Sequence, residues 1–95
     1  MQRLLPTEHE LIGGEETIEG EVVDDSVSRR IEGLVATVLR RIGSSADGWN
    51  TLYLDPEDGR FWEYSYPQSH MHGGGPPALK CLSNEEVRSR YGWVE

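Results

Sequence analysis

The hydrophobic positions of this chain change their period along the sequence, and each period predicts a different kind of element. Over residues 26–42, apolar side chains recur at helical spacing, which predicts one long helix. Its apolar stripe consists of Val27, Ile31, Leu34, Val35, Val38 and Ile42. The candidate N-terminal caps of this helix are Asp24, Asp25 and Ser26. At its C-terminal end, Arg40 and Arg41 would lie in the last turn, and Gly43 would end the helix.

Alternation with a period of two predicts strands on both sides of this helix. Residues 17–23 alternate weakly and carry the charge that is typical of an edge strand. Residues 49–54 and 60–66 are two runs of strand-forming residues, and the turn-forming residues 55–59 between them predict a hairpin. After a loop over residues 68–77, residues 78–82 are expected to add a third strand to this unit.

The end of the chain predicts a second, shorter helix. Ser83 and Glu86 have the spacing of a capping box, and the helix they open is expected to run to about Tyr91 and to stop at Gly92. The predicted order is β-α-β-β-β-α. Because short loops favour antiparallel neighbours, we expect an α+β fold, an antiparallel sheet of three to four strands with the long helix packed on one face. The 95 residues, 1–95, correspond to a single domain.

The charge of the chain narrows the classes of partner. With a formal net charge of −8 and a pI near 4.8, it is repelled by nucleic-acid phosphates and by anionic membranes. We therefore expect a basic protein as partner, and no nucleic acid and no membrane. Cys81 is the single cysteine, and the N-terminus has no apolar run of signal-peptide length, so we expect a cytoplasmic protein.

Two histidines raise the question of a metal site. His70 and His72 would point the same way on a strand, and Cys81 or Glu63 is a conceivable third ligand. Structural zinc sites use about four ligands in recognisable pairs, whereas this chain has one such pair in a predicted loop. We expect histidines without a metal ion, and no cofactor.

The remaining candidate chemistry is equally sparse. The run Gly73-Gly74-Gly75 is followed by two prolines, which lack N–H donors, so it predicts a sharply turned loop that packs on the chain itself or on a partner. The carboxylates that are candidates for acid–base chemistry fall mostly in the predicted turn, where they are typical turn formers: Asp55, Glu57, Asp58 and Glu63. We expect no catalytic residue and no enzymatic activity.

The aromatic residues suggest a binding surface. Trp62, Tyr64 and Tyr66 would share one face of a strand, and Trp49 and Tyr53 lie on the preceding strand. If the helix covers one face of the sheet, the aromatics of the other face are exposed, and tyrosine and tryptophan beside carboxylates are typical of binding hot spots. For Trp62, the core and the surface remain equal alternatives.

The central segment resembles a known family. The matching residues are Gly48-Trp49, Leu52-Tyr53, Asp55-Pro56, Asp58-Gly59-Arg60, Trp62-Glu63, Tyr66-Pro67-Gln68-Ser69 and His72-Gly73-Gly74-Gly75-Pro76-Pro77, with similar residues at Asp24-Asp25-Ser26-Val27-Ser28-Arg29-Arg30-Ile31 and Arg90-Tyr91-Gly92. This pattern resembles the immunity protein 27 family of bacterial polymorphic toxin systems. The resemblance implies an intracellular antidote that binds one cognate toxin domain, and it transfers no catalytic residues. The first 20 residues match least.

The leading hypothesis is therefore an immunity protein, monomeric or weakly homo-oligomeric, that neutralises a basic toxin domain; a nuclease is compatible with the charge. On chemical grounds, we expect acidic and aromatic residues of the hairpin and the following loop to contact it: Tyr53, Asp55, Glu57, Asp58, Trp62, Tyr64, His70 and His72. Two alternatives stay open. One is a small metal-binding or enzymatic domain that uses His70 and His72, and the other is a homo-oligomerising module that uses the acidic strand edge.

Overall fold

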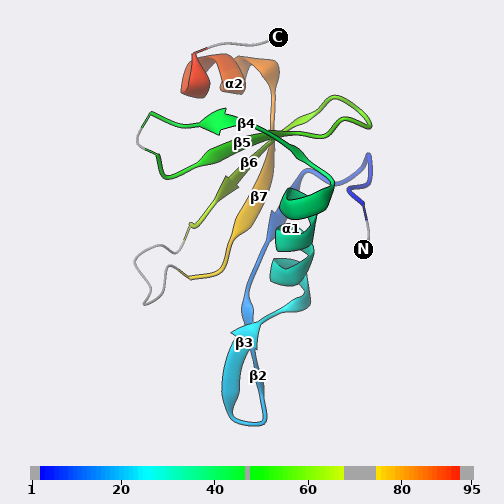
Figure 1. Cartoon of the computed structure of the whole chain (residues 1–95), viewed down its shortest axis with the longest axis vertical. Helices are drawn as coiled ribbons and strands as arrows, with labels where there is room; N and C mark the ends of the chain where they lie inside the picture. Colours follow the sequence, from blue (N-terminus) through cyan, green and yellow to red (C-terminus); the bar gives the residue numbers. More distant parts are fainter. Residues whose placement is uncertain (1–2, 47, 68–74, 93–95) are drawn as a thin grey trace.

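The computed structural model describes residues 3–46, 48–67 and 75–92, and this part of the chain forms an α+β fold (Figure 1). Its elements in chain order are β1 (Glu10–Ile12), β2 (Glu15–Ile18), β3 (Glu21–Asp24), α1 (Ser26–Thr37), β4 (Arg40–Ser44), β5 (Thr51–Leu54), β6 (Phe61–Ser65), β7 (Ala78–Leu82) and α2 (Asn84–Tyr91). The predicted fold class is confirmed. The expected three to four strands are too few, because the main sheet has five and a second sheet has two.

The main sheet has the strand order β1-β7-β6-β5-β4, and every neighbouring pair is antiparallel. The predicted hairpin is present as β5 and β6, and Gly59 takes the expected positive φ of 78° in its turn. The predicted third strand is β7, which pairs with β6. Strand β1 was not predicted, because three residues are too few for a periodic signal.

The prediction of one helix over residues 26–42 is wrong at its end. Helix α1 stops at Thr37, and the chain turns into β4 at Arg40. The backbone N–H groups of Val38 and Leu39 both donate to the Leu34 carbonyl, which closes the last turn. The two arginines therefore lie in a strand and Gly43 is no helix stop. The apolar residues after Thr37 fit both the helical period and the strand period. Pairing with β5 across a β-bulge determines that this segment forms a strand.

The predicted edge strand over residues 17–23 is a hairpin. Strands β2 and β3 pair with each other around Glu19 and Gly20, whose φ values are 52° and 84°. Two-residue hairpin turns of this kind need positive φ at both positions, and Gly20 was the signal for a turn inside the expected strand. We call residues 15–24 the arm, because they project from the body at one end of the long axis (Figure 1).

The core lies on both faces of the main sheet. On the α1 side, Trp62 is fully buried in a cluster with Leu4, Leu11, Ile31, Leu34, Leu39 and Leu79. On the α2 side, the buried residues are Leu52, Phe61, Leu82 and Val87. The structure thus places Trp62 in the core. It also places Tyr53 and Tyr64 beside this core, half-buried on the α1 side of the sheet.

Both helix starts agree with their sequence signals. Asp25 caps α1 by accepting a hydrogen bond from the Ser28 N–H, and the predicted capping box of α2 is complete at Ser83 and Glu86. Gly92 ends α2 in the left-handed conformation, with φ at 80°. Neither helix in the described ranges is long and apolar enough to cross a membrane.

A tight junction joins the arm to the body. The Gly13 N–H donates to the Pro77 carbonyl at 2.8 Å. The fully buried Ser28 hydroxyl accepts from the Gly14 N–H at 3.1 Å and donates to the Gly14 carbonyl at 3.0 Å. A Cβ on Gly13 would overlap the Ser28 Oγ and lie 2.5 Å from the Pro77 oxygen. A glycine is therefore required where the chain leaves β1 for the arm.

We expect Gly13→Ala to lower the free energy of unfolding by about 1–3 kcal/mol, because the added methyl overpacks this junction. Gly43→Ala is the matched control, since a Cβ there meets nothing within 4 Å, and its effect should stay within about 0.5 kcal/mol. Urea denaturation of both variants measures the difference. Equal stability of the two variants would contradict the tight junction.

Candidate functional site

The β5–β6 turn carries three of the predicted contact residues, and arginines neutralise much of its charge. Asp55 is buried, and its carboxylate accepts a hydrogen bond from the Glu57 N–H at 2.9 Å. Arg3 forms ion pairs with both Asp55 and Glu57. Asp58 pairs with the Arg60 Nε at 2.6 Å. The turn carboxylates thus hold neighbouring segments together and present little unpaired charge.

Two arginines fasten the N-terminal segment next to this turn. Arg30 of α1 makes two 2.7 Å hydrogen bonds to the Glu8 carboxylate. Arg60 donates to the carbonyls of Glu8 and Leu5, and its guanidinium lies 4.9 Å from the centre of the Trp62 ring. The hydrogen bonds from Arg30 lower the pKa of Glu8 from 4.5 to about 2, and the Leu5 N–H adds to this effect.

A tyrosine cluster, which consists of Tyr53, Tyr64 and Tyr66, lies beside α1. The Tyr64 hydroxyl donates to the Glu32 carboxylate and lies 2.7 Å from the Tyr66 hydroxyl. The rings of Tyr53 and Tyr66 both meet the Tyr64 ring edge to face. Burial, followed by the hydrogen bond to Glu32, raises the pKa of Tyr64 well above its usual value, so this hydroxyl stays protonated. The cluster presents rings and hydroxyls with Tyr66 39% exposed, which suits protein contact.

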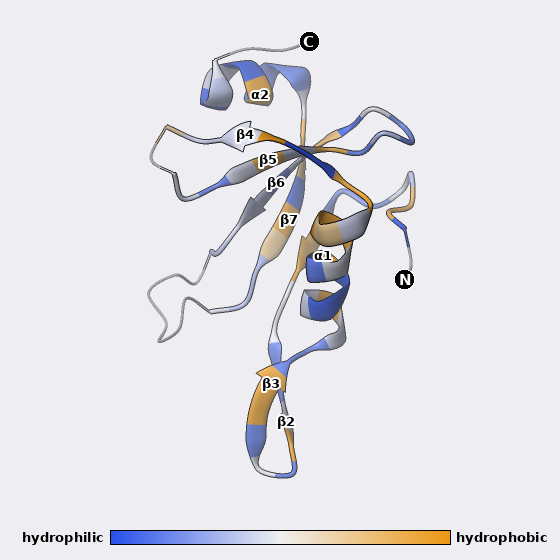
Figure 2. Cartoon of the chain, in the orientation of Figure 1, coloured by the Kyte–Doolittle hydropathy of each residue, from blue (hydrophilic) through white to orange (hydrophobic). Residues whose placement is uncertain are grey.

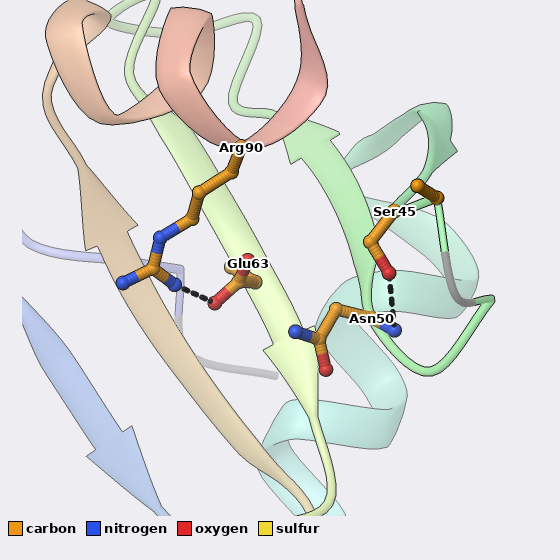
Figure 3. A pocket seen from close by; sticks show the side chains of 5 residues that line it. Ser45, Asn50, Glu63 and Arg90 are labelled. Carbon is orange, nitrogen blue, oxygen red and sulfur yellow. Dashed lines mark hydrogen bonds and ion pairs between the residues drawn. The ribbon is translucent and has the colours of Figure 1, made fainter.

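A pocket of about 290 Å³ lies on the other face of the sheet, near α2 (Figure 3). It is lined by Ser45, Ala46, Asn50, Glu63 and Arg90. The Glu63 side chain is 7% exposed and accepts hydrogen bonds from Arg90 at 2.7 Å and from the Tyr91 hydroxyl at 2.9 Å. Because both oxygens of this buried carboxylate are satisfied from α2, its role is to fasten that helix to β6.

The conceivable metal ligands are separated by the sheet. Trp62 is opposite Cys81 and Glu63 is opposite Lys80 in the β6–β7 register, so the Glu63 and Cys81 side chains point to opposite faces. These two residues therefore cannot bind the same ion. Among the described residues, no three His, Cys, Asp or Glu side chains are grouped to hold a metal. His70 and His72 lie outside the described residues, as does the loop glycine pair before Gly75.

The six predicted contact residues that the structure describes do not form one patch. Trp62 and Asp55 are buried, Tyr53 and Tyr64 are half-buried beside α1, and Glu57 and Asp58 are exposed in the β5–β6 turn. Sequence reasoning missed Glu32, for which the sequence holds no signal. It also missed the arm as a separate surface, although Gly20 marked its turn.

These features define a class of protein: a small α+β domain with a tyrosine-rich face and an acidic arm, suited to binding another protein. The chain matches the family model described as Immunity protein 27 over residues 17–83, and it belongs to this family. That span runs from β2 to the end of β7 and includes the whole tyrosine cluster. Searches of curated proteins and of solved structures found no match. Family membership supports an immunity function, a cognate toxin as partner and a non-enzymatic role.

The Glu8–Arg30 pair makes stability depend on pH. The folded-state pKa of Glu8 is depressed to about 2, so its stabilisation is present above pH 4.5 and is lost as the pH falls toward 2. We expect Glu8→Gln to remove about 1–3 kcal/mol of this acid-sensitive stability, with allowance for the partly solvated pair.

Urea midpoints between pH 7 and pH 2 measure this effect. Glu10→Gln is the control, because Glu10 is exposed and forms no ion pair within the described ranges. An unchanged pH dependence in Glu8→Gln would show that another carboxylate dominates.

Proposed function

We propose that this protein binds the toxin domain encoded beside it and blocks that toxin's activity, which protects the producing cell. The observation that carries the proposal is the membership of the chain in the immunity protein 27 family. In such a system, the antidote acts by occupying a surface that the toxin needs. No reaction of the antidote is required.

The charge of the chain supports a basic toxin. Seventeen Asp and Glu residues outnumber nine Lys and Arg residues. An acidic surface accelerates association with a basic partner and disfavours acidic competitors. A nuclease is one toxin class that fits, because a phosphate-binding surface is basic.

The tyrosine cluster supports a contact surface beside α1. Tyr53 and Tyr64 were expected to contact the toxin, and Tyr66 contacts Tyr64 through its hydroxyl and its ring. Rigid rings with a hydroxyl bury apolar area and still form hydrogen bonds, which explains their frequency at hot spots. The proposal retains Glu57 and Asp58 as peripheral contacts. Asp55 and Trp62 are buried and would hold these contact residues in position. His70 and His72 belong to the segment outside the described residues.

Co-expression with the neighbouring toxin gene tests the proposed function. We expect cells that express both proteins to survive, and the two proteins to co-purify at a fixed stoichiometry. Cells that express the toxin with an unrelated acidic protein of similar size serve as the control and should die. The function is wrong for that pair if cells die as quickly with this protein as without it.

A single substitution tests the tyrosine cluster. Tyr66→Ala should weaken toxin binding roughly tenfold, as removal of an interface aromatic commonly does. Trp49→Ala is the matched control, because Trp49 is 69% exposed in the segment between β4 and β5 and lies outside the cluster. Calorimetric titration of each variant into the purified toxin gives both dissociation constants. A larger loss for Trp49→Ala would move the contact away from the cluster.

A further inference from the structure

The arm extends the molecule and is attached to it at one end only. Its strands β2 and β3 pair with each other, and the main sheet comprises other strands. The principal extents of the chain are 46, 29 and 20 Å, and the arm lies at one end of the longest axis (Figure 1). Isolated two-stranded hairpins are marginally stable in water, and their outer edges leave backbone groups available for pairing. Because the arm projects from the body, its surface is not needed to enclose the core.

Both faces of the arm expose an aliphatic side chain. In the β2–β3 register, Thr17 is opposite Val22, and Ile18 is opposite Glu21, so the two aliphatic residues point to opposite faces. Val22 is 66% exposed and Ile18 is 53% exposed. In Figure 2, the orange colour that marks hydrophobic residues is present on β3, outside the body of the molecule. Each of these side chains therefore offers a single apolar contact on its face of the arm.

The arm also concentrates charge of one sign. Residues 15–24 contain five carboxylates and no lysine or arginine: Glu15, Glu16, Glu19, Glu21 and Asp24. Glu16 pairs with Arg29 at 3.4 Å, whereas the other four carboxylates form no ion pair within the described part of the chain. Glu15 and Asp24 are directly opposite in the register, and like charges in this position repel. A cation that binds here relieves this repulsion.

The tip of the arm places a carboxylate at an energetic cost. Glu19 is the only non-glycine residue with positive φ among the described residues. Asparagine or glycine is the usual choice at the first position of such a turn, because other side chains are strained there. Glu19 therefore places a negative charge at the tip of the arm, although its backbone conformation is strained there.

Two residues of α1 that are one helical turn apart contact the arm and the tyrosine cluster, respectively. Arg29 of α1 pairs with Glu16 and also donates to the Asp24 carbonyl. Glu32 follows Arg29 by one helical turn on the same side of α1 and accepts the hydrogen bond of Tyr64. The arm and the tyrosine cluster therefore both adjoin the exposed side of α1.

We infer that the arm is the principal toxin-docking element, and that it inserts into a basic groove that has apolar positions for Ile18 and Val22. The inference rests on the proposed function, because it names the contact surface of that complex. The occupant follows from charge complementarity: lysine and arginine side chains neutralise the unpaired carboxylates, while aliphatic contacts bury the two exposed side chains. The open strand edges add backbone hydrogen bonds to the toxin.

The test compares charge reversals in two places. The arm variant is Glu19→Lys with Glu21→Lys, and the control is Glu10→Lys with Glu85→Lys, which changes the net charge equally at exposed positions outside the arm. We expect the arm variant to bind the neighbouring toxin at least roughly a hundredfold more weakly and to lose protection in cells, since like charges across an interface are strongly disfavoured. The control should lose no more than about threefold through weaker steering. Circular dichroism and thermal melts confirm that both variants fold.

A third variant separates docking from folding. Glu19→Asn suits the turn better, so its melting temperature should rise, while its affinity for the toxin should fall severalfold because the tip charge is lost. A role of Glu19 in folding alone would leave the affinity unchanged. The substitution Val22→Ser should likewise weaken binding without a matching loss of stability, because this side chain is exposed.

Three outcomes would overturn proposals, and they are distinguishable. If wild-type protein binds the toxin and the arm variant binds equally well, the arm is not the docking element, and the proposed function stands. If light scattering shows a homo-oligomer that the arm variant dissociates, the arm's partner is a second copy of this chain. If wild-type protein neither binds the toxin nor protects cells from it, the proposed function itself fails.

Discussion

The positions of the basic residues in this fold determine where its negative charge remains unpaired. Five of the nine basic residues form ion pairs in the described structure: Arg3, Arg29, Arg30, Arg60 and Arg90. Four of them hold parts of the body together, namely the N-terminal segment, the β5–β6 turn and α2. Only Arg29 reaches the arm. The acidic residues of the body therefore serve mainly the fold, and those of the arm remain available for a partner.

The pairing of the turn carboxylates could not be predicted from the sequence. An acidic turn between two aromatic strands has the composition of a binding site, and Asp55, Glu57 and Asp58 were chosen for that reason. Asp58 pairs locally with Arg60, but the pairing of Asp55 and Glu57 with Arg3 joins residues that are about fifty positions apart in sequence. Local patterns carry no information about such pairs. The same limit applies to Glu32, which becomes a partner of Tyr64 only through the packing of α1 on the sheet.

Local residue patterns specify some elements of the fold, and contacts between residues distant in sequence determine others. The β5–β6 hairpin and the capping box of α2 were predictable, because turn and cap residues specify them directly. The end of α1 was not, since the apolar residues that follow Thr37 suit a helix or a strand until β5 offers a partner. The burial of Trp62 was also open, because the residue pattern does not reveal which sheet face the helix covers. In the arm, Gly20 indicated a turn, but the alternating pattern of the residues around it favoured one continuous strand.

Hydrogen exchange measured on the free protein and on its complex with the neighbouring toxin locates the docking surface most directly. Backbone amides of a two-stranded arm should exchange quickly in the free protein, because few buried contacts protect them. In the complex, we expect the largest gain in protection at residues 15–24, with a smaller gain around Tyr64 and Tyr66. Unchanged exchange in the arm, together with protection on the α2 side of the sheet, would contradict docking through the arm.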